Sequence, residues 1–308
     1  MINKLHIIIF SEEFKRKVER LFVTLSIVSF LVHLFLILIN YYGIINYPEN
    51  KLLNNPIVAI YTPFSFILVY EVFLVVYYLP RSISQYIRKQ YEIITLIIVR
   101  RIFKDIANID LTSNWFDQKY DLQLTYDLVS TLILFFIIYL YYYFNTKSKS
   151  ITKSIEKVDN LDAFIRRKKS IALLLFPILI VLAFSSLIKW IYVEIISIDH
   201  VFFSIQGINE LFFNDFFTVL IMADVLLLLI SLYKTDKFNE ILRNSGFIIS
   251  TILIRLSFSV EGLLNNVLIV TSVVYGFLML LMNIKFNKIQ IKFAKEIEIE
   301  EKESDEIV

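Results

Sequence analysis

Long apolar runs separated by short polar stretches make up most of this chain. Eight of these runs reach or approach the roughly 20 residues that an α-helix needs to cross a bilayer. The predicted crossings are residues 21–40, 57–79, 86–107, 126–144, 171–195, 212–232, 246–260 and 263–282. The pattern therefore predicts an all-α polytopic membrane protein with eight transmembrane helices.

The predicted helices fall into two similar sets of four. In each set an acidic residue stands on the second helix and an arginine on the third: Glu71 and Arg101 first, then Asp224 and Arg255. The two acid-to-arginine spacings are nearly equal. Because four crossings return a chain to its starting side, the two sets would be parallel, related by an axis along the membrane normal. We therefore predict two tandem parallel four-helix repeats.

Polar stretches divide the chain into five predicted parts. A cytoplasmic or interfacial segment precedes the first set of helices, a basic cytoplasmic linker separates the sets, and a charged cytoplasmic tail follows the second. The predicted boundaries are 1–20 for the N-terminal segment, 21–146 and 171–284 for the two membrane bundles, 147–170 for the linker and 285–308 for the tail.

The distribution of positive charge predicts the orientation. If the third and seventh segments both cross, every basic stretch falls on one side of the membrane, and only Lys51 and Lys119 fall on the other. Short cytoplasmic loops carry an excess of Lys and Arg. We therefore expect a multi-pass protein of the plasma (inner) membrane with both termini in the cytoplasm.

The third predicted helix is unusual because it carries Arg100, Arg101 and Lys104. A charged side chain at the centre of a bilayer costs about 2.5 kcal/mol or more, so such groups usually face a protein interior, pair with an acid or line a water-filled path. With a rise of about 1.5 Å per residue, Glu71 and Arg100 lie at similar depths, roughly 12 to 14 Å from the cytoplasmic ends of their helices.

Matched depth predicts one acid–arginine pair in each repeat. We expect Glu71 to pair with Arg100 or Arg101, and Asp224 to pair with Arg255. These pairs could form an ion pathway, a proton relay or an element that moves under the membrane potential, or they could be static salt bridges that set helix register.

Three further residues extend this candidate set. Arg101 and Asp105 are four residues apart, so they can also pair within one helix. Lys104 lies near the predicted outer boundary, where a long side chain can extend to the interface. His33, near the middle of the first helix, could shuttle protons or pack through a hydrogen bond.

Composition narrows the function classes. Hydrophobic residues make up 57% of the chain, and 31 Lys+Arg nearly balance 29 Asp+Glu, so a basic field for nucleic acid is absent. There is no cysteine and there are only three histidines, which excludes thiolate metal sites. The sequence contains no GxSxG, HExxH or P-loop motif. We expect no enzymatic activity, cofactor or bound metal.

The charge layout is similar to that of voltage-sensor domains, which are four-helix units with an acid on the second helix and arginines on a later one. That resemblance implies a response to membrane potential. In that family the cations recur at every third position on the fourth helix. Here Arg100 and Arg101 are adjacent on the third helix and Arg255 stands alone, so we assign the chain to no family.

Two hypotheses follow from these observations. The first is an ion or small-solute channel or transporter, or a membrane-potential sensor, with the acid–arginine pairs at its centre. The second is a non-conducting membrane scaffold whose charges lock the helices while its linker and tail dock a cytoplasmic partner. Expected partners are the lipid bilayer, an ion or small solute, and a second copy of the chain or a cytoplasmic protein.

Overall fold

The computed structural model describes residues 8–43, 56–106, 119–152, 169–178, 180–182, 185, 205–234, 238–260 and 262–305. All secondary structure in these residues is helical, which confirms the predicted all-α class for the part described. The elements are α2 (Glu12–Tyr41), η1 (Pro56–Ile60), α4 (Tyr61–Tyr78), α5 (Ile83–Ile106), α6 (Lys119–Thr152), α8 (Ile205–Lys234), α9 (Phe238–Ser257) and α10 (Leu263–Asp305). Residues 169–178 are also helical.

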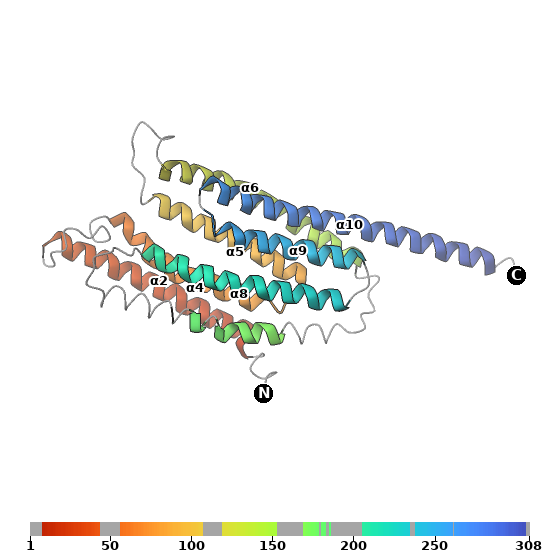
Figure 1. Cartoon of the computed structure of the whole chain (residues 1–308), viewed down its shortest axis with the longest axis horizontal. Helices are drawn as coiled ribbons and strands as arrows, with labels where there is room; N and C mark the ends of the chain where they lie inside the picture. The colour runs from red at the N-terminus through yellow and green to blue at the C-terminus, as the bar shows by residue number, and fades with distance from the viewer. Residues whose placement is uncertain are drawn as a thin grey trace.

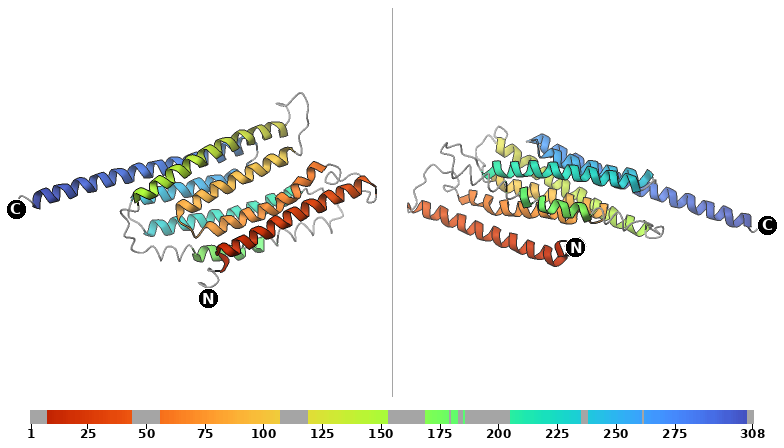
Figure 2. Two further views of the ribbon diagram at one scale, coloured as in Figure 1. Left: turned by 180° about the vertical axis from the view of Figure 1, so that it is seen from behind. Right: turned by 60° about the horizontal axis from the view of Figure 1, so that its bottom comes forward.

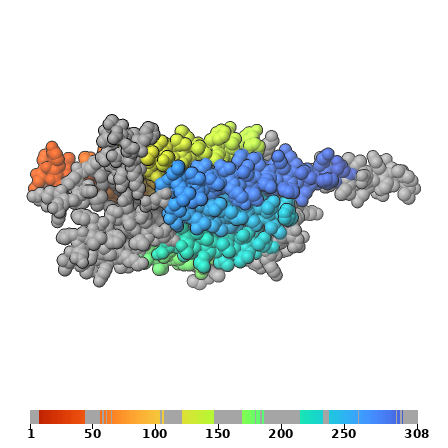
Figure 3. All heavy atoms as spheres, turned by 45° about the horizontal axis from the view of Figure 1, so that its top comes forward, coloured from red at the N-terminus to blue at the C-terminus, as the bar shows by residue number. Residues whose placement is uncertain are grey.

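The long helices lie side by side with their axes in nearly one direction (Figure 1). The two views in Figure 2 show the same bundle from behind and from below, with α2 along one edge and the last part of α10 extending beyond the other helices. On the face shown in Figure 3, α10 runs between α6 and α9, and α8 follows α9. The helices α5 and α9 carry Arg100, Arg101 and Arg255, and their axes run in the same direction as those of the other long helices (Figure 1).

Four segments are long and apolar enough to cross a membrane: Glu12–Tyr41, Asp121–Thr146, Asp215–Leu232 and Leu263–Gln290. Shorter apolar helices occur at Thr62–Tyr78 and Lys169–Leu182. Many large apolar side chains on these helices point outward, among them Leu31, Phe35 and Phe136, as expected of helices that face lipid. These features are compatible with a membrane protein.

Local sequence explains where several helices begin and end. The side chain of Ser11 accepts a hydrogen bond from the Phe14 backbone N–H at 3.0 Å and caps the start of α2. Pro80 follows α4, and Ser82 accepts a hydrogen bond from the Gln85 N–H at 3.4 Å at the start of α5. Asn265 donates to the carbonyl oxygens of Ser257 and Val260 at 2.6 and 3.0 Å, so it satisfies backbone acceptors beyond the end of α9.

Several helices are longer than the hydrophobic pattern predicts, and α6 and α10 are clear examples. The pattern begins the fourth crossing at residue 126, whereas α6 begins at Lys119, and this brings Asp121 onto the helix, where it is fully buried. The pattern ends the eighth crossing at residue 282, whereas α10 continues to Asp305. Lys and Glu are good helix formers, and Lys292 lies 3.5 Å from Glu296 one turn along.

The helix α5 is central to the packing. It contacts α4, α6 and α9 directly, and Ile87, Tyr91, Ile94 and Ile98 on it are almost completely buried. The Tyr91 ring packs edge-on against Tyr141 of α6, with ring centroids 5.3 Å apart. The face of α5 that carries these four residues therefore packs inside the protein.

Candidate functional site

Three arginines of the bundle each pair with an acidic residue on another helix. Each pair joins two consecutive helices: α4 with α5, α5 with α6, and α8 with α9. The arginines are Arg255 of α9, Arg101 of α5 and Arg100 of α5. All three were identified from the sequence. The structure adds their partners, which decide what each arginine can do.

Arg255 and Asp224 form a fully buried ion pair between α9 and α8. Their side chains are 2% and 0% exposed, and Arg255 Nη1 donates to Asp224 Oδ2. Arg255 Nη2 also donates to the Tyr86 hydroxyl at 2.9 Å, and that hydroxyl donates to Asp224 Oδ1 at 3.0 Å. Thr251 donates to Asp224 Oδ2 at 2.8 Å. Both carboxylate oxygens are therefore hydrogen-bonded, as a buried charge requires.

Arg101 lies in a second network with Asp127 of α6. Its Nε donates to one carboxylate oxygen of Asp127, and its Nη2 donates to the other at 2.7 Å, which makes the pair bidentate. Arg101 Nη1 donates to the Asn265 side-chain oxygen at 2.7 Å, and Nη2 also donates to Asn266. Gln123 donates to Asp127 Oδ1 at 2.7 Å. Arg101 is thus bound by α6 and α10.

The partners of Arg101 differ from those the sequence allowed. Sequence spacing offered Glu71 between helices and Asp105 within α5, and the structure pairs Arg101 with Asp127. Adjacent residues on a helix point about 100° apart, so Arg100 and Arg101 face different neighbours. Arg100 faces α4 and Arg101 faces α6.

The third pair, Arg100 with Glu71 of α4, is held more loosely. Arg100 Nη2 lies 3.6 Å from Glu71 Oε2, and Nη1 donates to the Phe64 carbonyl oxygen at 3.3 Å. Glu71 is buried, yet its Oε2 has no hydrogen-bond partner among the described residues. A buried carboxylate oxygen without a hydrogen bond carries a desolvation penalty of about 1–3 kcal/mol or more.

The other predicted residues lie outside these clusters. His33 of α2 is buried, and its Nδ1 is hydrogen-bonded to the hydroxyl of Thr62 in α4. Lys104 lies on α5, and its side chain is outside the part of the chain that the structure describes. In that part, no group of three or more His, Cys, Asp or Glu side chains is arranged to hold a metal ion.

Sequence reasoning missed the neutral and aromatic members of the networks. Asn265 and Asn266 lie in the first turn of α10, a position where asparagine is typical of a loop or a helix cap. Tyr86 lies near the start of α5, a position where tyrosine is typical of the membrane interface. Asp127 could have been predicted as a partner for an arginine, because it is an acidic residue within an apolar run, one residue inside the predicted fourth crossing.

A hydroxyl chain joins three helices between the charged clusters. The hydroxyl groups of Tyr91 and Ser250 are 2.8 Å apart, and Ser250 donates to the Ser272 carbonyl oxygen at 2.6 Å. Gly276 of α10 leaves the space for the Tyr91 hydroxyl. These hydrogen bonds link α5, α9 and α10 through uncharged groups.

We compared the chain with protein-family models, curated proteins and solved structures, and none of them matches it. The functional argument therefore rests on the charges and their geometry.

Proposed function

We propose that this chain is an inner-membrane protein that crosses the bilayer eight times as two tandem parallel four-helix repeats, with both termini in the cytoplasm. Four apolar helices support the proposal directly. For α5 and α9, support comes from their direction in the bundle and from the burial and pairing of Arg100, Arg101 and Arg255 (Figure 1). An arginine that faces protein and pairs with an acid is the form in which arginine is tolerated inside a membrane.

The placement of the acid–arginine pairs supports the repeat. Glu71 of α4 pairs with Arg100 of α5, and Asp224 of α8 pairs with Arg255 of α9. Each pair thus joins the second and third helices of its proposed repeat. The excess of Lys and Arg on one side supports the cytoplasmic location of both termini.

Within this architecture, we propose that the protein moves or senses an ion or small solute, and that Glu71 and Arg100 are the working pair. The supporting observation is the contrast among the three arginines. Arg255 and Arg101 each bind a carboxylate whose two oxygens are both hydrogen-bonded, whereas Glu71 Oε2 lies 3.6 Å from Arg100 and has no hydrogen bond among the described residues. A pair with unused hydrogen-bonding capacity can accept a proton or a cation, or exchange partners, at a lower energetic cost than a pair whose oxygens are all hydrogen-bonded.

Ion flux in proteoliposomes tests this proposal. We expect the parent protein to carry a measurable flux of protons or small cations, and we expect Glu71→Gln and Arg100→Gln to reduce it at least about tenfold, which corresponds to about 1.4 kcal/mol. Glu13→Gln makes the same chemical change on the exposed surface of α2 and should leave the flux unchanged. A parent without flux, or folded variants at parental flux, would contradict the proposal.

A second candidate is the non-conducting scaffold that docks a cytoplasmic partner. The saturated networks of Arg255 and Arg101 favour it, because they fix helix positions, and so does the part of α10 that extends beyond the bundle (Figure 2). In this case flux is absent, and deletion of residues 296–308 should abolish co-purification of a partner from the native membrane.

A further inference from the structure

A separate cluster of cations and tyrosines lies at the end of the bundle where α2 and α5 begin and α4 ends. Its cations come from α2, from the turn after α4 and from α5. They are Lys15, Arg81, Arg88 and Lys89, and each lies within 6 Å of a tyrosine ring centroid. We infer that this cation–tyrosine cluster binds the phosphate headgroup of an anionic phospholipid. The inference goes beyond the proposed transport function and concerns a different part of the molecule.

The tyrosine rings gather the cations into one place. Lys15 lies 5.5 Å and Lys89 5.4 Å from the centroid of the Tyr78 ring, so two like charges share one aromatic ring. Arg88 lies 4.6 Å from the centroid of the Tyr142 ring. Cation–π contact partly offsets the desolvation of each cation, but it removes none of the positive charge. Two ammonium groups held near one ring favour an anion between or beside them.

Acidic side chains neutralise only part of this charge. Glu12 lies 3.5 Å from Arg81 and 3.7 Å from Lys15, and Glu92 lies 2.6 Å from Lys89 and 3.9 Å from Arg88. Each carboxylate is therefore shared by two cations.

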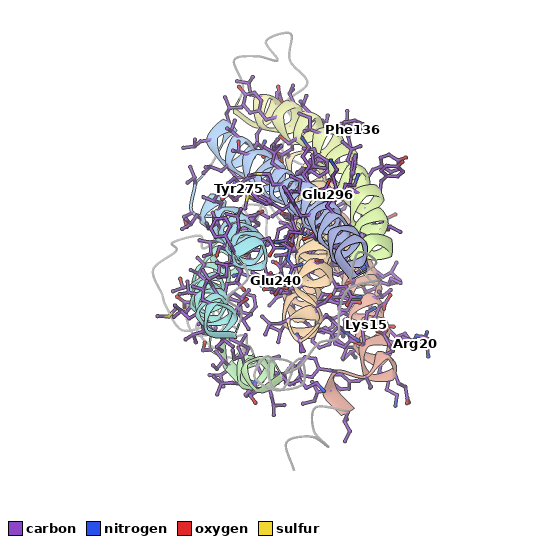
Figure 4. All side chains as sticks on the ribbon, turned by 90° about the vertical axis from the view of Figure 1, so that its right-hand side faces the viewer. Lys15, Arg20, Phe136, Glu240, Tyr275 and Glu296 are labelled. Carbon is purple, nitrogen blue, oxygen red and sulfur yellow. The ribbon has the colours of Figure 1, made fainter. Side chains whose placement is uncertain are left out.

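The surrounding helix segment adds further positive charge, since Arg16, Lys17 and Arg20 outnumber Glu13 and Glu19. In Figure 4, Lys15 lies on the side of α2 that faces the other helices, and Arg20 points away from the bundle.

Two side-chain atoms of the cluster, Arg88 Nε and Glu92 Oε1, are buried without a hydrogen-bond partner among the described residues, and only Arg88 Nε is a donor. Arg88 Nε has no hydrogen bond among the described residues, because its nearest acid, Glu92, lies 3.9 Å away. Arg81 Nη2 donates to the Tyr77 hydroxyl at 3.3 Å, and that hydroxyl donates to Glu12 Oε1 at 3.2 Å. Guanidinium and ammonium donors together match the oxygens of a phosphate group.

The position of the cluster favours a lipid over a soluble anion. It lies where the apolar part of α2 begins, and farther along the same helix Leu21, Leu25 and Val28 expose apolar side chains, on a different side of α2 from Lys15. With these side chains in the acyl layer, the cations lie at the level of the lipid headgroups. Basic pockets between helices at the cytoplasmic side of a membrane bind anionic headgroups in this way.

Native mass spectrometry of the purified full chain tests the inference. We expect phosphatidylglycerol to be retained in preference to phosphatidylcholine. The triple variant Arg81→Gln, Arg88→Gln and Lys89→Gln should weaken phosphatidylglycerol binding, by about fivefold for each uncompensated charge removed. A matched triple variant on the C-terminal part of α10, Lys285→Gln, Lys288→Gln and Lys292→Gln, removes the same charge elsewhere and should bind as the parent does.

Further measurements distinguish a lipid headgroup from a soluble phosphate or the chain's own tail, and they check that each variant is folded. Lys89→Arg keeps the charge and should retain binding, and circular dichroism checks the helix content of every variant. Equal retention of the two lipids, or parental binding by the first triple variant, would overturn the inference. So would displacement of phosphatidylglycerol by glycerol phosphate, which would indicate a site for soluble phosphates, or by a peptide of residues 296–308, which would assign the cluster to the chain's own acidic tail.

Discussion

At the scale of single residues, the three buried arginines differ in how completely their charges are satisfied. Arg255 shares Asp224 with a tyrosine and a threonine, so every oxygen of that carboxylate has a hydrogen bond. Arg100 reaches its acid only at 3.6 Å and completes its coordination with a backbone carbonyl. A saturated pair resists change, because breaking it leaves an uncompensated buried charge.

The saturated pair leads to a prediction about stability. We expect Asp224→Asn to lower the free energy of unfolding by about 3–5 kcal/mol, since it leaves the Arg255 guanidinium without a counter-charge at a site that is only 2% exposed. Unfolding of the purified protein by denaturant in mixed micelles, followed by circular dichroism, measures this change.

The matched control removes both charges together. Replacing Asp224 by Leu and Arg255 by Met in one chain should cost much less than Asp224→Asn alone, because an apolar pair of similar volume leaves no charge unpaired. If the double variant were as unstable as the single one, disrupted packing and not the unpaired charge would account for the loss of stability.

Four charged members of the site could be predicted from the sequence, whereas Asp127 and the neutral members were missed. Glu71, Arg100, Asp224 and Arg255 stand out because a charge in an apolar run has few physical solutions. Depth along the helices matched Asp224 with Arg255, but it left Glu71 with either Arg100 or Arg101 and did not find Asp127 for Arg101. Asn265 and Tyr86 give no such signal, because amides and tyrosines are common at helix ends and interfaces.

At the scale of helices, Gly276 of α10 leaves the space that the Tyr91 side chain of α5 occupies. A Cβ atom at that position would lie 1.7 Å from the Tyr91 hydroxyl and 2.8 Å from the Ser250 hydroxyl. Tyr91 cannot easily move, because its ring is fully buried against Tyr141. We expect Gly276→Ala to lower the free energy of unfolding by about 1–3 kcal/mol through overpacking.

Two comparisons check the Gly276 prediction. Thr271→Ala on the exposed face of the same helix should change the stability little. Tyr91→Phe removes the atom nearest to the new Cβ, so it should partly restore the stability of Gly276→Ala. A Gly276→Ala protein as stable as the parent would mean that the Tyr91 and Ser250 side chains can move away from the new Cβ without loss.

Helix existence was easier to predict than helix length. Apolar runs located the described helices, because the bilayer length requirement is a strong constraint. That constraint says nothing about residues outside the membrane, where helix propensity continues α10 to Asp305 and starts α6 at Lys119.

At the scale of the whole molecule, the two proposed repeats are bonded to each other through the polar networks. Arg101 of the first binds Asn265 and Asn266 of the second, and Tyr86 of the first binds Arg255 of the second. Helix order and the spacing of acid and arginine predicted two repeats, but they contain no information about which polar groups meet between them. Because hydrogen bonds join the two proposed repeats, we expect them to move together. A rearrangement of the Glu71–Arg100 pair would then involve α4 and its neighbours and not the whole second repeat.

The eight-crossing topology yields the last prediction, and the chain is well suited to test it because it contains no cysteine. If α9 crosses the membrane, its two ends lie on opposite sides. Phe238 and Ser259 are both exposed near those ends, and neither is among the charged clusters. We expect Ser259→Cys in intact cells to react with a membrane-impermeant maleimide, and Phe238→Cys to react only after the membrane is permeabilised.

The same logic applies to α5, which carries two arginines into the bundle. Ile106→Cys at its far end should be labelled from outside, whereas Arg81→Cys before its start should be protected until permeabilisation. Labelling of both ends of either helix from one side would mean that the helix does not cross. Without the α5 crossing the basic linker would fall on the wrong side of the membrane, and without the α9 crossing the C-terminal tail would lie on the side opposite the N-terminus. Because the arginine pairs need α5 and α9 inside the bilayer to matter for transport, that result would also remove the physical reason for a working pair at Glu71 and Arg100.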